Sequence, residues 1–187
     1  MKYIAIFASG GGSNAAQIIK HFSKNDNITV SLIICNNSNA GVLDIAKENN
    51  ISTVLITKTE MYHNQMLLNI LQNNNIDFIV LAGFLWLVPN YIVTAFPKKI
   101  VNIHPALLPN YGGKGMYGHH VHEAVWQANE KYTGMTIHYA DEEYDKGEFI
   151  YQAKCKIDEN ETAQDISKKV LALEHFYYPK VIESLCK

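Results

Sequence analysis

The stretch KYIAIFASGGGSN, residues 2–14, runs from an apolar segment through three consecutive glycines to a hydroxyl and an amide side chain. Apolar residues at 3–7 indicate a buried strand, and the pattern from 13 to 24 indicates a helix. A glycine turn between them lets the backbone approach a ligand closely, because glycine carries no side chain. A strand, a glycine turn and a helix in this order predict the first unit of a parallel α/β sheet.

The same alternation continues through the first half of the chain. Strands are predicted at 3–7, 29–35, 53–56, 78–81 and 100–103, and helices at 13–24, 42–49, 61–73 and 90–96. This order predicts an α/β fold: a doubly wound, mostly parallel sheet with helices on both faces and a Rossmann-like N-terminal half. Ligands of such sheets bind beyond the carboxyl ends of the strands, here the segments ASGGGSN, CNNSNAG, AGF and NIHP.

The second half of the chain has a different pattern. It predicts a helix at 119–128, strands at 134–140 and 148–157 joined by the polar turn DEEYDKG, and a long closing helix at 162–185. Neither a repeat nor a linker divides the sequence. We therefore expect a single domain over residues 1–187.

Charge and composition narrow the possible partners. The 187 residues carry a net charge of −2, so we expect no nucleic-acid or anionic-membrane surface. All 16 basic residues are lysines, and the sequence contains no arginine. Without a guanidinium group, an anionic ligand must be held by backbone N–H groups, hydroxyls, amides or lysine.

Cysteine usage and hydropathy indicate the compartment. Cys35, Cys155 and Cys186 are scattered and form no C-x-x-C pair, which argues for reduced thiols and against a disulfide framework or a zinc site. The longest apolar run, 78–88, is too short to cross a bilayer, and the N-terminal residues lack the pattern of a signal peptide. We expect a cytoplasmic protein without a membrane partner.

The glycine loop fits two familiar nucleotide-binding patterns only in part. Gly10-x-Gly12-x-x-Ala15 matches the dinucleotide fingerprint, but asparagines follow the strand that ends at Cys35, where an acid would hold a ribose. A Walker loop requires Gly-Lys-Ser/Thr, whereas Ser13 follows Gly12 here. Neither a dinucleotide nor a nucleoside triphosphate is therefore favoured.

A single phosphate fits the same loop better. Gly11 and Gly12 allow close approach, Ser13 offers a hydroxyl and Asn14 an amide, and the helix N-terminus adds free N–H groups. A tight turn with Ser13 as the N-cap residue is an equally consistent interpretation of these residues alone.

The stretch VNIHPALLP, residues 101–109, contains the first catalytic candidates. Asn102 and His104 point to the same side of a strand, and Pro105 favours an extended backbone at His104. An amide donor beside an imidazole can stabilise a developing oxyanion, and the imidazole can also transfer a proton. A hydrogen-bonded strand end without catalytic role is the alternative.

A carboxylate that orients His104 and favours its protonated form is expected in the polar turn. The turn and its flank offer five acids, most of them expected to be solvated: Asp141, Glu142, Glu143, Asp145 and Glu148. We favour Asp145, which precedes Lys146-Gly147 and the next strand. The histidines of HHVHEA are not expected to bind metal, because His119 and His122 share a helical face that His120 does not.

Taken together, these motifs resemble the glycinamide ribonucleotide transformylase family of folate-dependent formyltransferases. The resemblance rests on GGGSN, VLAGF, NIHPALLP, TIHYADEEYDKG and LEHFYYPKVI, in order over nearly the whole chain. It implies transfer of the formyl group of 10-formyltetrahydrofolate to the amine of glycinamide ribonucleotide in de novo purine biosynthesis. Folate would be a cosubstrate, without metal, and the protein a monomer or homodimer acting on small molecules.

The resemblance also assigns roles to residues. Asn102, His104 and Asp145 would form the catalytic set, Gly12, Ser13 and Asn14 would bind the substrate phosphate, and Glu174 would bind the glycinamide end. The half at 1–100 would bind the phosphate and the half at 101–187 would hold the catalytic and folate sites. A cis peptide before Pro109 is implied as well. Folate contacts are implied for Leu85, Trp86, Leu87, Val88, Asn102, Asp141, Glu142, Glu143 and Tyr144.

Two features depart from the resemblance. Many relatives carry arginines near the folate, where this chain has Leu85-Trp86-Leu87 and TKTEMYHNQ, so either lysine or backbone holds the glutamate tail or folate binding is weaker. The segment NYGGKGMYGHHVHEA is longer and richer in glycine than the usual link. It is either a mobile flap, with Lys114 near an anion, or a plain surface loop.

Three other functions compete with formyl transfer to glycinamide ribonucleotide. An N-formyltransferase for an amino sugar nucleotide would need base-stacking and diphosphate contacts that the sequence does not indicate. A nucleotide-binding module would have no need for Asn102, His104 and an acid together. A dehydrogenase is disfavoured by the missing acid after the second strand.

Overall fold

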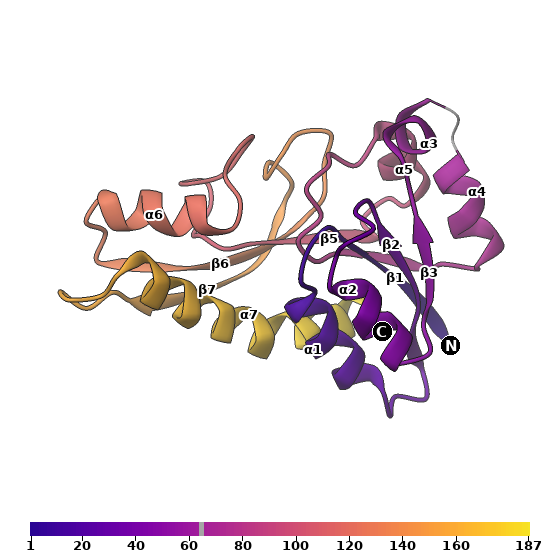
Figure 1. Ribbon diagram of the computed structural model, residues 1–187, viewed down its shortest axis with the longest axis horizontal. Coiled ribbons are helices and arrows are strands. Elements are labelled where there is room, and N and C mark those ends of the chain that lie inside the picture. The colour runs from indigo at the N-terminus through magenta and orange to yellow at the C-terminus, as the bar shows by residue number, and fades with distance from the viewer. Residues whose placement is uncertain (64–65) are drawn as a thin grey trace.

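The computed structural model describes residues 1–63 and 66–187 and has one seven-stranded sheet (Figure 1). The strand order is β3-β2-β1-β4-β5-β6-β7. The first five strands run parallel, and β6 and β7 are antiparallel to their neighbours. The strands are β1 (Lys2–Ala8), β2 (Ile28–Cys35), β3 (Ser52–Leu55), β4 (Phe78–Leu81), β5 (Ile100–His104), β6 (Tyr132–Tyr139) and β7 (Phe149–Lys156). The predicted α/β class and mostly parallel sheet are confirmed.

Helices cover both faces of the parallel strands. The helices of the described residues are α1 (Ser13–Phe22), α2 (Val42–Glu48), α3 (Lys58–Tyr62), α4 (Met66–Asn73), α5 (Asn90–Ala95), α6 (His119–Gln127) and α7 (Ala163–Leu185), of which α6 packs against α7. One core joins alternate side chains of β1 and β2 to α1, α2 and α7, and a second joins the opposite side chains to α4 and α5. Two buried faces explain why these strands are apolar at nearly every position.

The predicted helix at 61–73 differs from the structure at its beginning. Helix α3 starts earlier, at Lys58, because the Thr57 hydroxyl and the Glu60 carboxylate cap each other's backbone N–H groups. Helix α4 begins at Met66. The part of the predicted helix at 64–65 lies outside the described residues. No helix of the described chain has both the length and the apolarity needed to cross a membrane.

A buried tyrosine of the closing helix α7 forms hydrogen bonds to the central strands of the sheet. Tyr178 is fully buried, and its hydroxyl lies 2.9 Å from the carbonyl oxygen of Leu81 on β4 and 3.1 Å from that of Val101 on β5. Glu174, one turn earlier on the buried face of the helix, lines the cavity beyond these strand ends. The tyrosine therefore fixes α7 against the strands that carry the candidate site.

Replacing Tyr178 by phenylalanine should destabilise the protein. The change removes the hydroxyl that serves two buried carbonyls, and we expect a loss of about 1–3 kcal/mol in the free energy of unfolding. Urea unfolding followed by circular dichroism measures the effect. Tyr132→Phe is the matched control, since Tyr132 is 47% exposed, and it should unfold within about 0.5 kcal/mol of wild type. Equal midpoints for Tyr178→Phe and wild type would contradict this role of the hydroxyl.

Candidate active site

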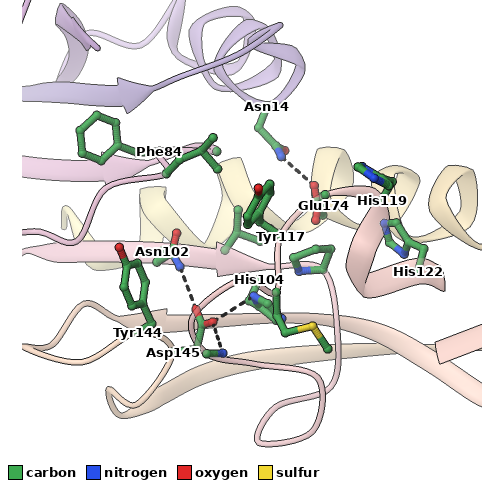
Figure 2. Close-up of a pocket in the computed structure, with 18 of the residues that line it drawn as sticks. Asn14, Phe84, Asn102, His104, Tyr117, His119, His122, Tyr144, Asp145 and Glu174 are labelled. Atoms are coloured by element: carbon green, nitrogen blue, oxygen red, sulfur yellow. Dashed lines mark hydrogen bonds and ion pairs between the residues drawn. The ribbon is translucent and has the colours of Figure 1, made fainter. Parts of the chain in front are cut away.

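A cavity of about 630 Å³ lies beyond the carboxyl ends of the central strands (Figure 2). Its wall combines the end of β5, the turn after β4, the segment before α6, the β6–β7 turn and the inner face of α7. This is the edge at which the parallel sheet predicts a ligand. The side chains and backbone that line it include Asn14, Phe84, Leu85, Asn102, His104, Lys114, Tyr117, His119, His122, Tyr144, Asp145 and Glu174.

The end of β5 presents Asn102 and His104 to this cavity. The strand is hydrogen-bonded to β4 on one side and to β6 on the other, which fixes its register. Ile103 between them is 8% exposed, and His104 is 3% exposed despite lining the cavity. The peptide bond before Pro109 is cis, as the resemblance implies.

Asp145 lies between the two β5 side chains and the segment before α6. Its Oδ2 atom is 3.4 Å from Nδ1 of His104 and accepts a 2.8 Å hydrogen bond from the N–H of Gly113. Its Oδ1 atom is 3.4 Å from Nδ2 of Asn102. The structure thus brings together the three side chains that the sequence singles out for catalysis (Figure 2).

His138 on β6 is a fourth member of this group, and our sequence analysis missed it. It pairs with Asn102 across the strands, and its Nδ1 atom donates to the carbonyl of Tyr139 at 2.8 Å. Its Nε2 atom lies 3.2 Å from Nδ2 of Asn102 and 3.5 Å from Oδ1 of Asp145. A neutral His138 accepts from Asn102, and a protonated one donates to Asp145.

Opposing effects act on the two central ionisable groups. Burial would raise the pKa of Asp145, but the hydrogen bond from His138, the charge of His104 and the N–H of Gly113 hold the pKa below its usual value. Burial lowers the pKa of His104, while Asp145 and the carbonyl of Tyr111 oppose this shift. The carboxylate therefore remains ionised in a site that excludes most water.

His104 faces an acceptor at each ring nitrogen. Its Nε2 atom lies 2.7 Å from the carbonyl oxygen of Tyr111, and its Nδ1 atom faces Asp145. A carbonyl can only accept, so Nε2 carries the proton in the neutral ring. The imidazolium form satisfies both acceptors, which suits a histidine that stabilises negative charge.

The glycine loop is a turn before α1 whose backbone approaches α2. Gly12 is the N-cap residue with φ +79°, and Ser13 begins the helix, so the interpretation of Ser13 as N-cap is wrong. A Cβ atom on Gly12 would lie 2.9 Å from atoms of Val42 and Ile45. Glycine is required there by conformation and by space. The first N–H groups of α1 lack partners within the helix, as expected at a helix start.

The half-buried Asn14 and the buried Glu174 form a pair at the α7 side of the cavity. Nδ2 of Asn14 donates a 2.7 Å hydrogen bond to Oε2 of Glu174 (Figure 2). Burial raises the pKa of Glu174 to about 7, although the hydrogen bond from Asn14 acts in the opposite direction. The amide oxygen of Asn14 is buried without a hydrogen-bond partner among the described residues.

The residues implied in folate contact lie around a second, smaller cavity next to the first. This cavity, of about 40 Å³, is lined by Trp86, Leu87, Val88, Asn102, Asp141, Glu143 and Tyr144, while Leu85 lines the larger one. Glu142 is exposed, and its N–H donates to the side chain of Asp141 at 2.7 Å. The Trp86 ring lies tilted against that of Tyr62, with ring centres 6.4 Å apart, and Nζ of Lys58 lies 5.9 Å from the Trp86 ring centre.

The segment before α6 forms part of the cavity wall. Gly113, Lys114 and Tyr117 line the larger cavity, so the segment is more than a surface loop. At the start of α6, the exposed His119, His120 and Glu123 bring one ligand atom each within 4.8 Å of one another. His120 thus lies beside His119 and Glu123, and His122, which the sequence analysis placed on the same face as His119, is not part of this group. Two imidazoles and a carboxylate are a donor set that could hold a transition-metal ion.

Comparison with known proteins gives a consistent result. Residues 2–182 match the Formyl transferase family. The chain is 39% identical over 192 residues to the phosphoribosylglycinamide formyltransferase of Arabidopsis thaliana, covering all of this chain and 66% of that protein, slightly less than two thirds. It is 34% identical to the phosphoribosylglycinamide formyltransferase of Bacillus subtilis, covering 99% of this chain and 95% of that protein.

The fold is shared with a solved structure as well. The crystal structure of glycinamide ribonucleotide transformylase 1 from Geobacillus kaustophilus superposes with a TM-score of 0.90 at 32% identity, covering all of both chains. The sequence motifs, the strand order and the cavity at the end of β5 agree with these comparisons. The chain belongs to the formyl transferase family.

Proposed function

We propose that the protein transfers the formyl group of 10-formyltetrahydrofolate to the amine of glycinamide ribonucleotide, a step of de novo purine biosynthesis. The observation that carries this proposal is the cluster of Asn102, His104 and Asp145 in one cavity with Glu174. The names of the relatives in Arabidopsis and Bacillus support the choice of acceptor. Tetrahydrofolate and formylglycinamide ribonucleotide are the products.

The ribonucleotide binds with its phosphate at the glycine loop and its glycinamide end toward Glu174. Its phosphate binds at Gly12, Ser13 and Asn14 at the start of α1, mainly through backbone N–H groups, the Ser13 hydroxyl and the Asn14 backbone. The Asn14 side chain already donates to Glu174, and the two receive the glycinamide end together. The amine then lies on the side of the cavity that faces Asn102 and His104.

The folate binds along the turn after β4 and the β6–β7 turn. Leu85, Trp86, Leu87 and Val88 offer backbone groups and apolar surface to the pterin, opposite Asp141, Glu142, Glu143 and Tyr144. The cavity between them shares Asn102, Tyr144 and Asp145 with the larger cavity, so the two form one path for the folate. Lys58 beside Trp86 is a cation on this path that can hold the glutamate tail.

The chemistry proceeds through a tetrahedral intermediate. The glycinamide nitrogen attacks the formyl carbon, and the carbonyl oxygen becomes an oxyanion held by protonated His104 and the amide of Asn102. Nδ2 of Asn102 has two long contacts, 3.2 Å to Nε2 of His138 and 3.4 Å to Oδ1 of Asp145, which it can give up for the oxyanion. Asp145 holds His104 and, through water, helps carry a proton from the attacking amine to the folate nitrogen as the carbon–nitrogen bond to the folate breaks.

The remaining assignments follow from this function. The protein acts on small molecules, without a metal cofactor, nucleic acid or membrane, as a monomer or homodimer in the cytoplasm. An N-formyltransferase for an amino sugar nucleotide is the competing function. Incubating the protein with 10-formyltetrahydrofolate and either acceptor, and following tetrahydrofolate by absorbance, separates the two. Turnover with the amino sugar nucleotide alone would overturn the proposal.

Replacing Asn102 by alanine should slow formyl transfer by roughly 100- to 1,000-fold, because one oxyanion donor is lost. The Kd for glycinamide ribonucleotide, measured by calorimetry, should remain within about twofold, since the ribonucleotide is held elsewhere in the cavity. Asn160→Ala, in an exposed turn before α7, is the control and should keep wild-type turnover. Near-normal kcat in Asn102→Ala would remove this residue from the catalytic set.

Replacing Glu174 by glutamine should alter the pH dependence of ribonucleotide binding. With a pKa of about 7, Glu174 is mostly protonated at pH 6 and mostly ionised at pH 8, where it accepts from the glycinamide end. Glutamine stays neutral throughout. We therefore expect the ratio of the ribonucleotide KM, variant over wild type, to rise about tenfold between these pH values.

The matched control for this experiment is Glu183→Gln, which changes a carboxylate of the same helix that pairs with His21 at 2.8 Å, away from the cavity. Its KM should follow that of wild type over the whole pH range. Measuring both variants at several pH values also removes the titration of the substrate's own amine and phosphate from the comparison. A ratio for Glu174→Gln that does not change with pH would show that its ionisation plays no part in binding.

A further inference from the structure

We propose that Tyr111, Gly112 and Gly113 position the side chains of His104 and Asp145. The hydrogen bond of the Tyr111 hydroxyl to Glu130 holds these three residues in place. The three residues, here called the backbone brace, contact both His104 and Asp145. This inference rests on the proposed function for its kinetic consequence, whereas its effect on the His104 ring can be measured without any activity. It assigns a role to a segment that the sequence predicts only as a flap or a surface loop.

The first contact of the backbone brace is made by a main-chain carbonyl. The oxygen of Tyr111 lies 2.7 Å from Nε2 of His104, the shortest polar contact of that ring. Tyr111 has φ +58°, a left-handed conformation that costs energy for a residue with a side chain. Such a conformation persists only where the surroundings hold it, and here it accompanies the contact between the carbonyl and the histidine.

The next two residues contact the carboxylate. The N–H of Gly113 donates to Oδ2 of Asp145 at 2.8 Å, the same oxygen that faces Nδ1 of His104. A Cβ atom on Gly112 would lie 2.5 Å from Leu108 and 3.3 Å from Cβ of Asp145. The backbone therefore packs directly on Asp145. Three successive residues thus fix the histidine from one side and its carboxylate from the other.

The side chain of Tyr111 anchors the backbone brace on the opposite side of the loop. Its hydroxyl donates a 2.8 Å hydrogen bond to Oε1 of Glu130, in the turn between α6 and β6. Both residues line a third cavity, of about 470 Å³, which shares no lining residue with the cavity of the candidate active site. The hydroxyl is remote from the reacting atoms, so Tyr111 acts through its carbonyl and not by touching substrate.

The consequence for the reaction is a choice between two nitrogens. The Nε2–H group of His104 donates to the Tyr111 carbonyl. In the imidazolium form, the Nδ1–H group, which also faces Asp145, is therefore the donor that can bind the oxyanion. The other titratable groups that face His104 or its carboxylate are His138 on β6 and His122 on α6. Loss of the carbonyl contact should reduce the preference for the Nε2–H tautomer and lower the pKa of His104.

The direct test is nitrogen NMR of the protein labelled with ¹⁵N-histidine, with the His104 signals assigned by the spectrum of His104→Asn. In wild type we expect the neutral ring of His104 to be protonated at Nε2. In Tyr111→Phe and Glu130→Ala we expect a mixture of tautomers and a titration midpoint lower by up to about one pH unit. Glu130→Gln, which keeps an acceptor oxygen for the hydroxyl, should restore the wild-type spectrum.

Kinetics supply the second readout. Tyr111→Phe and Glu130→Ala should each lower kcat by about three- to tenfold, the effect of one hydrogen bond, with both KM values within about twofold of wild type. Tyr91→Phe is the matched control. It removes a tyrosine hydroxyl that donates to the Met61 carbonyl at 2.6 Å, away from His104, and should leave both the spectrum and kcat unchanged.

Two results would overturn the inference. One is a His104 tautomer and titration in Tyr111→Phe and Glu130→Ala that superpose on wild type. The other is an equal loss of kcat in Tyr91→Phe, which would indicate a general effect on stability. If the wild-type protein does not formylate glycinamide ribonucleotide, the proposed function fails, while the NMR experiment still decides whether the backbone brace positions His104.

Discussion

A buried carboxylate needs partners on every side, and the site is organised around this requirement of Asp145. Its oxygens are met by the ring of His104, the amide of Asn102, the ring of His138 and the N–H of Gly113. These partners come from β5, β6 and the segment before α6, so the carboxylate joins parts of the chain that are distant in sequence. Leaving such a charge unpaired would cost several kcal/mol, which is why strand register and loop conformation are constrained together here.

Much of the fold follows from residue patterns, because local preference and tertiary packing agree. The apolar runs at β1, β2 and β4 are buried on both faces, and this explains both their composition and their parallel pairing. The beginning of α3 was harder to predict. Its apolar periodicity is short, and the start is set by the capping pair Thr57 and Glu60, which the periodicity does not reveal.

The candidate site could be predicted where chemistry is concentrated in a short motif, as at Asn102 and His104. Asp145 could be selected from five acids by its place before Lys146-Gly147 and the next strand, but its contacts depend on a φ of +57° and on an N–H of a distant segment. His138 was missed because its role arises from pairing across β5 and β6. A histidine two residues from Thr136 in a strand that is buried over most of its length is the signal that could have identified it.

Helix α7 also relates the two ends of the cavity to each other. Tyr178 binds the carbonyls of β4 and β5, and Glu174 lies one turn away on the same helix face, hydrogen-bonded to Asn14 at the start of α1. The separation between the glycine loop and the end of β5 is therefore set by a continuous helix and a central sheet, both of which resist stretching. A ligand that must reach from the glycine loop to the end of β5 is therefore selected by its length as well as by its functional groups.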